Sequence, residues 1–127
     1  MNSREVPKSL KNWFLAHFIA DLIFAIPLFL FPEFTLGLFK ITSLDPATTR
    51  LVAAALIGIG GASLFSYNKN KESYNILLTL KILWSITAIL GLIVSIILGE
   101  SPSSLWIVVL IFSIFSITWI YYKIKLK

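Results

Sequence analysis

Four long apolar runs occupy most of this sequence and limit what it can fold into. They are residues 13–31, 51–67, 76–98 and 105–122. A helix needs about 20 apolar residues to cross roughly 30 Å of hydrocarbon. In lipid, a continuous apolar run must also satisfy its own backbone hydrogen bonds, which a helix does. The sequence therefore predicts an all-α, polytopic membrane protein, with residues 1–127 forming a single bundle of four transmembrane helices.

The composition excludes several classes of function. Hydrophobic residues make up 57% of the chain and charged residues only 13%, which is far from the soluble average. There is no cysteine, so disulfides and thiol chemistry are excluded. His17 and Asp21 are too few ligands for zinc, and we expect no metal and no other cofactor. The net charge of +5 comes from cations that flank the apolar runs, so we expect no nucleic-acid partner.

The distribution of lysine and arginine predicts the orientation of the bundle. With four spans, the two termini and the loop between the second and third runs share one side of the membrane. That side carries eight cations: Arg4, Lys8, Lys11, Lys69, Lys71, Lys123, Lys125 and Lys127. The other side carries two, Lys40 and Arg50. The positive-inside rule then predicts a multi-pass plasma-membrane protein with both termini in the cytoplasm, and the bias is too strong for a dual-topology protein.

The segment between the first two runs contains two further local signals. The stretch PEFTLGLFKI mixes apolar with small or polar residues, which predicts a short interfacial helix. Asp45 and Pro46, followed by Thr48, are typical of a capped helix start with proline in the first turn. The second spanning helix is therefore expected to begin close to this cap.

Polar side chains inside the apolar runs are the candidate functional residues. A rise of 1.5 Å per residue places His17 and Lys81 about 6–8 Å from the inner end of their helices. The same arithmetic places Asp21, Ser85 and Ser113 about 12–14 Å deep. His17 and Asp21 are four residues apart and share a helix face. Because a charged carboxylate at mid-membrane costs at least about 2.5–3.5 kcal/mol, we expect Asp21 to cluster with His17 and Lys81, with the two serines as neutral partners.

Three interpretations of this cluster remain open at the level of sequence. Intramembrane ionisable groups are functional candidates by default, so the cluster could bind a polar head group or carry a proton. Alternatively, Asp21 and Lys81 could form a buried pair that fixes helix register. In the third interpretation, Lys81 extends to the interface and leaves Asp21 protonated.

A stripe of small residues runs along the second apolar run. Ala54, Gly58 and Ala62 follow one another at four-residue steps. Small residues at this spacing let helix backbones approach closely. We expect this stripe to pack inside the bundle, and a homodimer face or the floor of a ligand cavity are the alternatives.

The first half of the chain is similar in layout to a known family. FPEFTLGLF closes the first run, and an arginine then opens the Gly/Ala-rich second run in RLVAAALIGIGGASLF. Over residues 13–67 this resembles the DoxX-like group of small prokaryotic membrane proteins. The resemblance implies a four-helix bundle with both termini inside, and some members are associated with quinone-linked redox complexes. It assigns no functional residue to this chain.

No motif in the sequence specifies a reaction, and we expect a non-enzymatic role. The expected function is binding of a lipid or small hydrophobic ligand, or service as an accessory subunit of a membrane complex. The alternative is a proton-coupled small-molecule transporter with Asp21 as the proton or substrate carrier. An enzyme acting on an isoprenoid or quinone, with Asp21 and His17 as acid and base, is a third class. The expected partners are the lipid bilayer, a bound lipid or hydrophobic molecule, and a second copy or another membrane protein.

Overall fold

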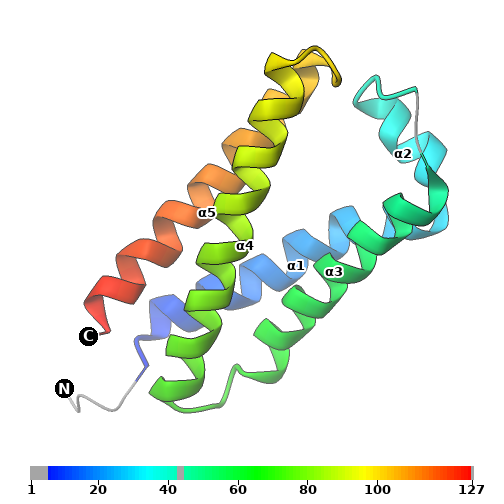
Figure 1. The fold of residues 1–127 in the computed structure, drawn as a ribbon. Coiled ribbons are helices and arrows are strands. Elements are labelled where there is room, and N and C mark those ends of the chain that lie inside the picture. The colour runs from blue at the N-terminus through cyan, green and yellow to red at the C-terminus, as the bar shows by residue number, and fades with distance from the viewer. Residues whose placement is uncertain (1–5, 43–44, 127) are drawn as a thin grey trace.

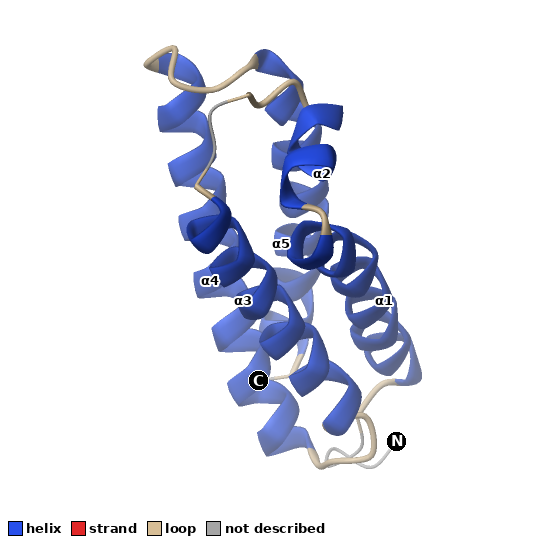
Figure 2. Cartoon of the chain, turned by 90° about the vertical axis from the view of Figure 1, so that its right-hand side faces the viewer, coloured by secondary structure: helices blue, strands red, loops and turns tan. Residues whose placement is uncertain are grey.

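The computed structural model describes residues 6–42 and 45–126. Its helices, in chain order, are α1 (Lys8–Leu30), α2 (Pro32–Leu38), α3 (Pro46–Phe65), α4 (Lys71–Ile97), the 3₁₀ turn η1 (Ser103–Leu105) and α5 (Trp106–Lys125). No strand occurs in this part of the chain (Figure 2). The predicted all-α class is confirmed.

Four helices are long and apolar enough to cross a membrane. They are Lys8–Leu30, Pro46–Phe65, Lys71–Ile97 and the combined segment Ser103–Lys125. The predicted four-span, multi-pass organisation is confirmed at this level. α1, α3 and α4 each begin five residues before the predicted apolar run. Each of these helices starts with a polar turn, which a prediction based on apolar residues does not include.

Local sequence sets the helix ends. The side chain of Asp45 accepts a hydrogen bond from the Thr48 backbone amide, and Pro46 occupies the first turn of α3, which confirms the predicted cap. The side chain of Asn70 caps α4 in the same way through the Ser73 amide. At the other end of α4 the chain turns at Gly99, whose positive φ of 74° suits glycine. The predicted short helix after the first span is also present, as α2.

The helices form two hairpins that meet at one end and diverge at the other (Figure 1). α1 packs along α3, and α4 packs along α5. The hairpins join through an apolar cluster, here called the basal cluster: Leu10, Phe14, Tyr74, Leu78, Trp119, Tyr122 and Leu126. The start of α1, the α3–α4 loop and the end of α5 lie at this closed end. At the diverging end, α2 packs on α1 and α3, and the Ser104 hydroxyl of the other hairpin donates to the carbonyl of Phe39, the residue that follows α2.

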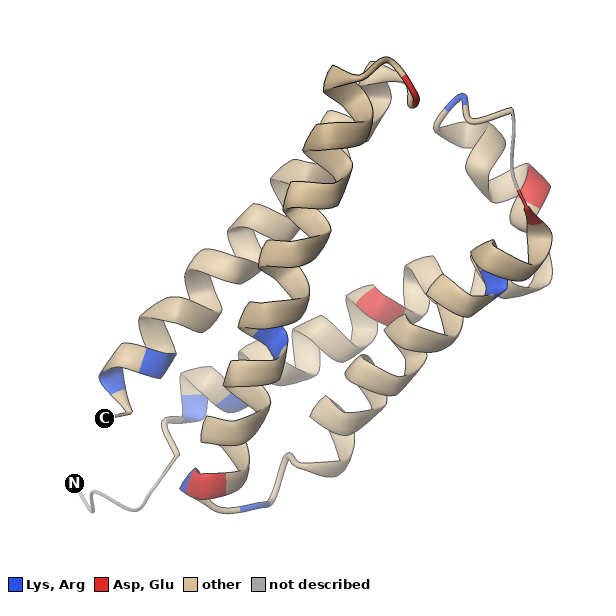
Figure 3. Cartoon of the chain, in the orientation of Figure 1, with Lys and Arg blue, Asp and Glu red and all other residues tan. Residues whose placement is uncertain are grey.

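Charged residues avoid the middle of the helices, with few exceptions (Figure 3). Most lie at the closed end or in the segments that join the spans. Arg4 and Lys127, which contribute to the predicted charge bias, lie outside the described residues. The exceptions, more than one turn from the polar helix ends, are Asp21 on α1 and Lys81 on α4, and both are buried. The fold therefore sets two buried charges at the point where the hairpins begin to separate.

Candidate functional site

The buried charges are joined through His17, which lies between them. Nδ1 of His17 is hydrogen-bonded to the Lys81 ammonium, and its Nε2 lies 3.3 Å from Asp21 Oδ1. The side chains come from both hairpins, since His17 and Asp21 lie on α1 and Lys81 on α4. The structure therefore brings the three predicted residues into one chain of contacts, in which histidine mediates between the cation and the carboxylate.

Lys81 is enclosed on every side. Its ammonium donates to the Ser63 hydroxyl on α3 and lies 4.7 Å from the Phe14 ring centre and 4.9 Å from that of Trp119. Aromatic faces attract a cation, most strongly when water is excluded. Only 1% of the Lys81 surface is exposed. The interpretation in which Lys81 extends to the membrane interface is therefore wrong.

The hydrogen-bonding capacity of these groups allows two proton arrangements. When Lys81 is charged, its ammonium can only donate, so His17 Nδ1 accepts and the ring proton lies on Nε2, the nitrogen 3.3 Å from Asp21 Oδ1. Moving one proton from Lys81 to His17 and one from His17 to Asp21 yields a second arrangement with the same net charge. The chain Lys81–His17–Asp21, here called the relay, can thus pass a proton without charging the histidine.

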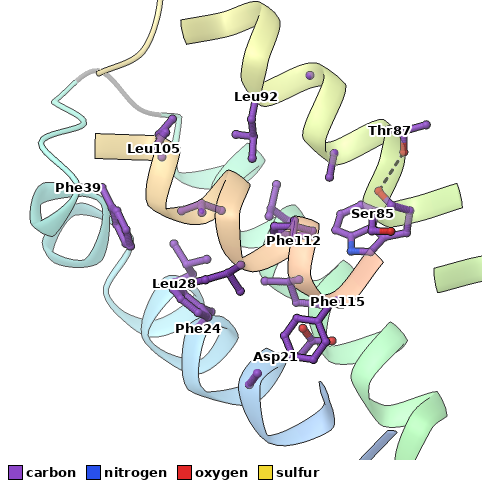
Figure 4. A pocket seen from close by; sticks show the side chains of 18 of the residues that line it. Asp21, Phe24, Leu28, Phe39, Ser85, Thr87, Leu92, Leu105, Phe112 and Phe115 are labelled. Carbon is purple, nitrogen blue, oxygen red and sulfur yellow. Dashed lines mark hydrogen bonds between the residues drawn. The ribbon is translucent and has the colours of Figure 1, made fainter. Parts of the chain in front are cut away.

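The relay ends at the wall of a cavity between the two hairpins. The cavity has a volume of about 630 Å³, within the range of roughly 300–1,000 Å³ that is usual for small-molecule sites. His17 and Asp21 both line the cavity. Asp21 lies on the opposite side of the cavity from Phe39 and Leu105 (Figure 4). Aliphatic and aromatic side chains such as Phe24, Leu28, Leu92, Ile111 and Phe112 make up most of the wall.

Three side-chain nitrogen or oxygen atoms in the described part of the chain are buried and have no hydrogen-bond partner. They are Asp21 Oδ2, Thr35 Oγ1 and the indole nitrogen of Trp84. All three residues line this one cavity, from α1, α2 and α4 respectively. Buried polar groups are nearly always hydrogen-bonded, and each exception needs a physical explanation. Their concentration around one apolar cavity points to an occupant that carries hydrogen-bonding groups.

The predicted serine partners do not join the cluster. Ser85 lines the cavity, but its hydroxyl donates to the Ile82 carbonyl at 3.2 Å. Ser113 donates to the Val109 carbonyl at 2.8 Å. Both bonds stay within one helix, because a serine hydroxyl readily reaches the carbonyl three or four residues earlier. The serine that does contact the relay is Ser63, which the sequence pattern did not single out.

The predicted packing stripe faces away from the helix interface. Ala54 and Gly58 are exposed, and a methyl group added at Gly58 would meet no described atom within 4 Å. The close approach between α1 and α3 occurs at Gly60, where an added Cβ would lie 2.9 Å from Asp21 Cβ. Packing of the Ala54–Gly58–Ala62 stripe inside the bundle is therefore wrong, and the face that does pack carries Gly60 and Ser63.

Comparisons with protein-family models, with curated proteins and with solved structures find no match to this chain. The resemblance to the DoxX-like group thus stays an expectation. Within the described residues, no group of three or more His, Cys, Asp or Glu side chains could hold a metal ion. The arrangement offers instead a hydrogen-bonding site at the end of an apolar cavity and a relay that can shift a proton to it.

Proposed function

We propose that this protein binds a lipid or other small amphipathic molecule in the cavity between its two hairpins. The observation that carries the proposal concerns the buried side-chain polar atoms that lack a partner in the described chain. They belong to Asp21, Thr35 and Trp84, and all three residues line this cavity. An apolar wall with a few polar groups is the usual composition of a small-molecule site. The ligand would place its polar group at Asp21 and its apolar body between the hairpins.

The proposed orientation follows from the cations. The closed end carries Lys8, Lys11, Lys69, Lys71, Lys123 and Lys125, and we place it in the cytoplasm of a plasma-membrane protein. The hairpins then diverge toward the outer leaflet, so a lipid-like ligand would enter from that side.

The experiment is to look for a co-purified ligand and then to fill the cavity. Native mass spectrometry of the protein in detergent should reveal an added mass that organic extraction removes. Gly91 lines the cavity, and a side chain added there would begin in open space, with no described atom within 4 Å. Gly91→Phe should therefore abolish the added mass. Gly58→Phe, on the exposed stripe of α3, is the matched control and should retain it.

The relay favours one second candidate, proton-coupled transport. His17 connects Lys81 to the Asp21 carboxylate at the cavity wall. The basal cluster closes the end of the molecule that lies opposite the diverging helices. A transporter built this way would move a proton between Asp21 and its substrate, and the hairpins would rock to open the closed end. In liposomes, flux of a bound ligand that depends on a pH gradient and disappears in Asp21→Asn would support transport. Ligand retention without flux would support binding alone.

A further inference from the structure

The head group of the ligand can be inferred from the charges around the cavity. Among the described residues, the charged groups at this site are Lys81 and Asp21, joined through His17. The other lining residues are neutral. One positive and one negative charge therefore balance before any ligand arrives. An ionic head group would bring an uncompensated charge into a largely apolar cavity, which is strongly unfavourable.

The unpartnered atoms define what a neutral head group must offer. Asp21 is only 7% exposed. Its Oδ1 lies 3.3 Å from His17 Nε2, whereas Oδ2 has no hydrogen-bond partner in the described chain. An ionised carboxylate oxygen needs a donor. The Trp84 indole nitrogen, also without a partner there, can only donate and so needs an acceptor. A hydroxyl group supplies both functions in one small, uncharged unit.

We infer that the ligand is a neutral amphiphile whose hydroxyl head group donates to Asp21, while the Trp84 indole donates to an oxygen of the same ligand. This inference rests on the proposed function, because it specifies the ligand of the same cavity. The apolar body of the molecule lies along Phe24, Leu28 and Phe112 toward the diverging end. There the Thr35 hydroxyl offers a second polar contact.

The test uses three probes with the same alkyl chain: dodecan-1-ol, dodecylamine and dodecane-1-sulfonate. Each is added at the same mole fraction to phosphatidylcholine nanodiscs that hold the protein at pH 7, where the amine and the sulfonate are charged. Native mass spectrometry then measures the bound fraction after lipid removal. The alcohol should bind at least tenfold more tightly than either charged probe.

Two variants shift the charge balance in opposite directions. Asp21→Asn leaves the Lys81 charge unpaired, and the preferred probe should change from the alcohol to the sulfonate. Lys81→Met leaves the Asp21 carboxylate unpaired, and the preferred probe should become the amine. Glu100→Gln and Lys69→Met make the same chemical changes outside the cavity and should keep the preference for the alcohol.

The outcomes separate this inference from the proposed function. If the wild type binds all three probes equally, or prefers a charged one, the neutral head group is refuted while ligand binding in the cavity stands. If the wild type binds none of the three probes and carries no co-purified ligand, the neutral head group and the proposed ligand binding are both refuted. An unchanged ranking in two folded charge variants also refutes the charge-balance argument. Where a variant does not fold, the ranking in the wild type decides.

Discussion

The contact between Gly60 and Asp21 supports a prediction that isolates one interface. Alanine at position 60 would place its Cβ 2.9 Å from Asp21 Cβ and 3.0 Å from Asp21 Oδ2. Non-bonded carbon atoms prefer separations of about 3.5–4.0 Å. The α1 and α3 backbones, or the Asp21 side chain, must therefore shift by roughly 0.6 Å in Gly60→Ala. Such overpacking typically costs about 1–3 kcal/mol.

The matched control lies two residues away on the same helix. Gly58→Ala meets no described atom within 4 Å, so it should show only the gain in helix propensity, about 0.5–1 kcal/mol. Because Gly60→Ala makes the same gain, the propensity terms cancel in the difference between the variants. That difference should be about 1–3 kcal/mol, with Gly60→Ala the less stable. For a domain of this size, 1 kcal/mol corresponds to roughly 4 °C in Tm.

The assay measures thermal unfolding of both variants in the same detergent, with circular dichroism as the signal. Reversible unfolding in a denaturing detergent would give the free energies directly. Two variants with the same stability, within about 0.5 kcal/mol, would refute the close approach at Gly60. A second readout is ligand retention. Displacement of the Asp21 side chain in Gly60→Ala should weaken it, whereas Gly58→Ala should leave it unchanged.

Two further predictions concern the relay and a helix cap. His17→Leu removes the group between Lys81 and Asp21, so unfolding free energy should fall by about 3–5 kcal/mol, while Asn12→Leu on the exposed face of α1 should have little effect. An unchanged Tm for His17→Leu would show that the buried charges do not need the histidine. Hydrogen bonds from the Thr48 hydroxyl and amide lower the pKa of Asp45. Its contribution to stability should hold above pH 3.8 and fade as the pH drops further, a loss that Asp45→Asn should abolish in acid titrations followed by circular dichroism.

Much of the architecture could be predicted because it follows from strong local signals. Continuous apolar runs specify spanning helices, and Asp45 with Pro46 specifies a helix start. The predicted positions of the helix ends were less accurate. Polar turns such as the first turn of α4, which begins at Lys71 after the Asn70 cap, continue a helix beyond its apolar core. The hairpin pairing and the packing of α2 on α1 and α3 depend on tertiary contacts, which no local sequence pattern specifies.

The central part of the relay could also be predicted, because burying a carboxylate in a membrane requires partners. Depth along the helices brought His17, Asp21 and Lys81 together, and the structure shows these contacts. Ser63 was missed, although it lies four residues before Tyr67 and hence about 6 Å from the inner interface, at the level of His17. In a Gly/Ala-rich run, a single small serine did not stand out from its neighbours. What depth could not reveal was that the histidine would stand between the two charges.

The wrong prediction for the Ala54–Gly58–Ala62 stripe has the same origin as the failure to predict Ser63. α3 carries small residues on more than one face, so spacing alone cannot select the face that packs. Ser63 lies three residues after Gly60 and thus on the same side of the helix. A polar side chain in a spanning helix turns toward the protein interior when a partner exists there. The need to satisfy Lys81 therefore orients α3, and that orientation brings Gly60 against Asp21, where only a residue without a side chain fits. In this bundle, the buried charges determine which small residues become the packing surface.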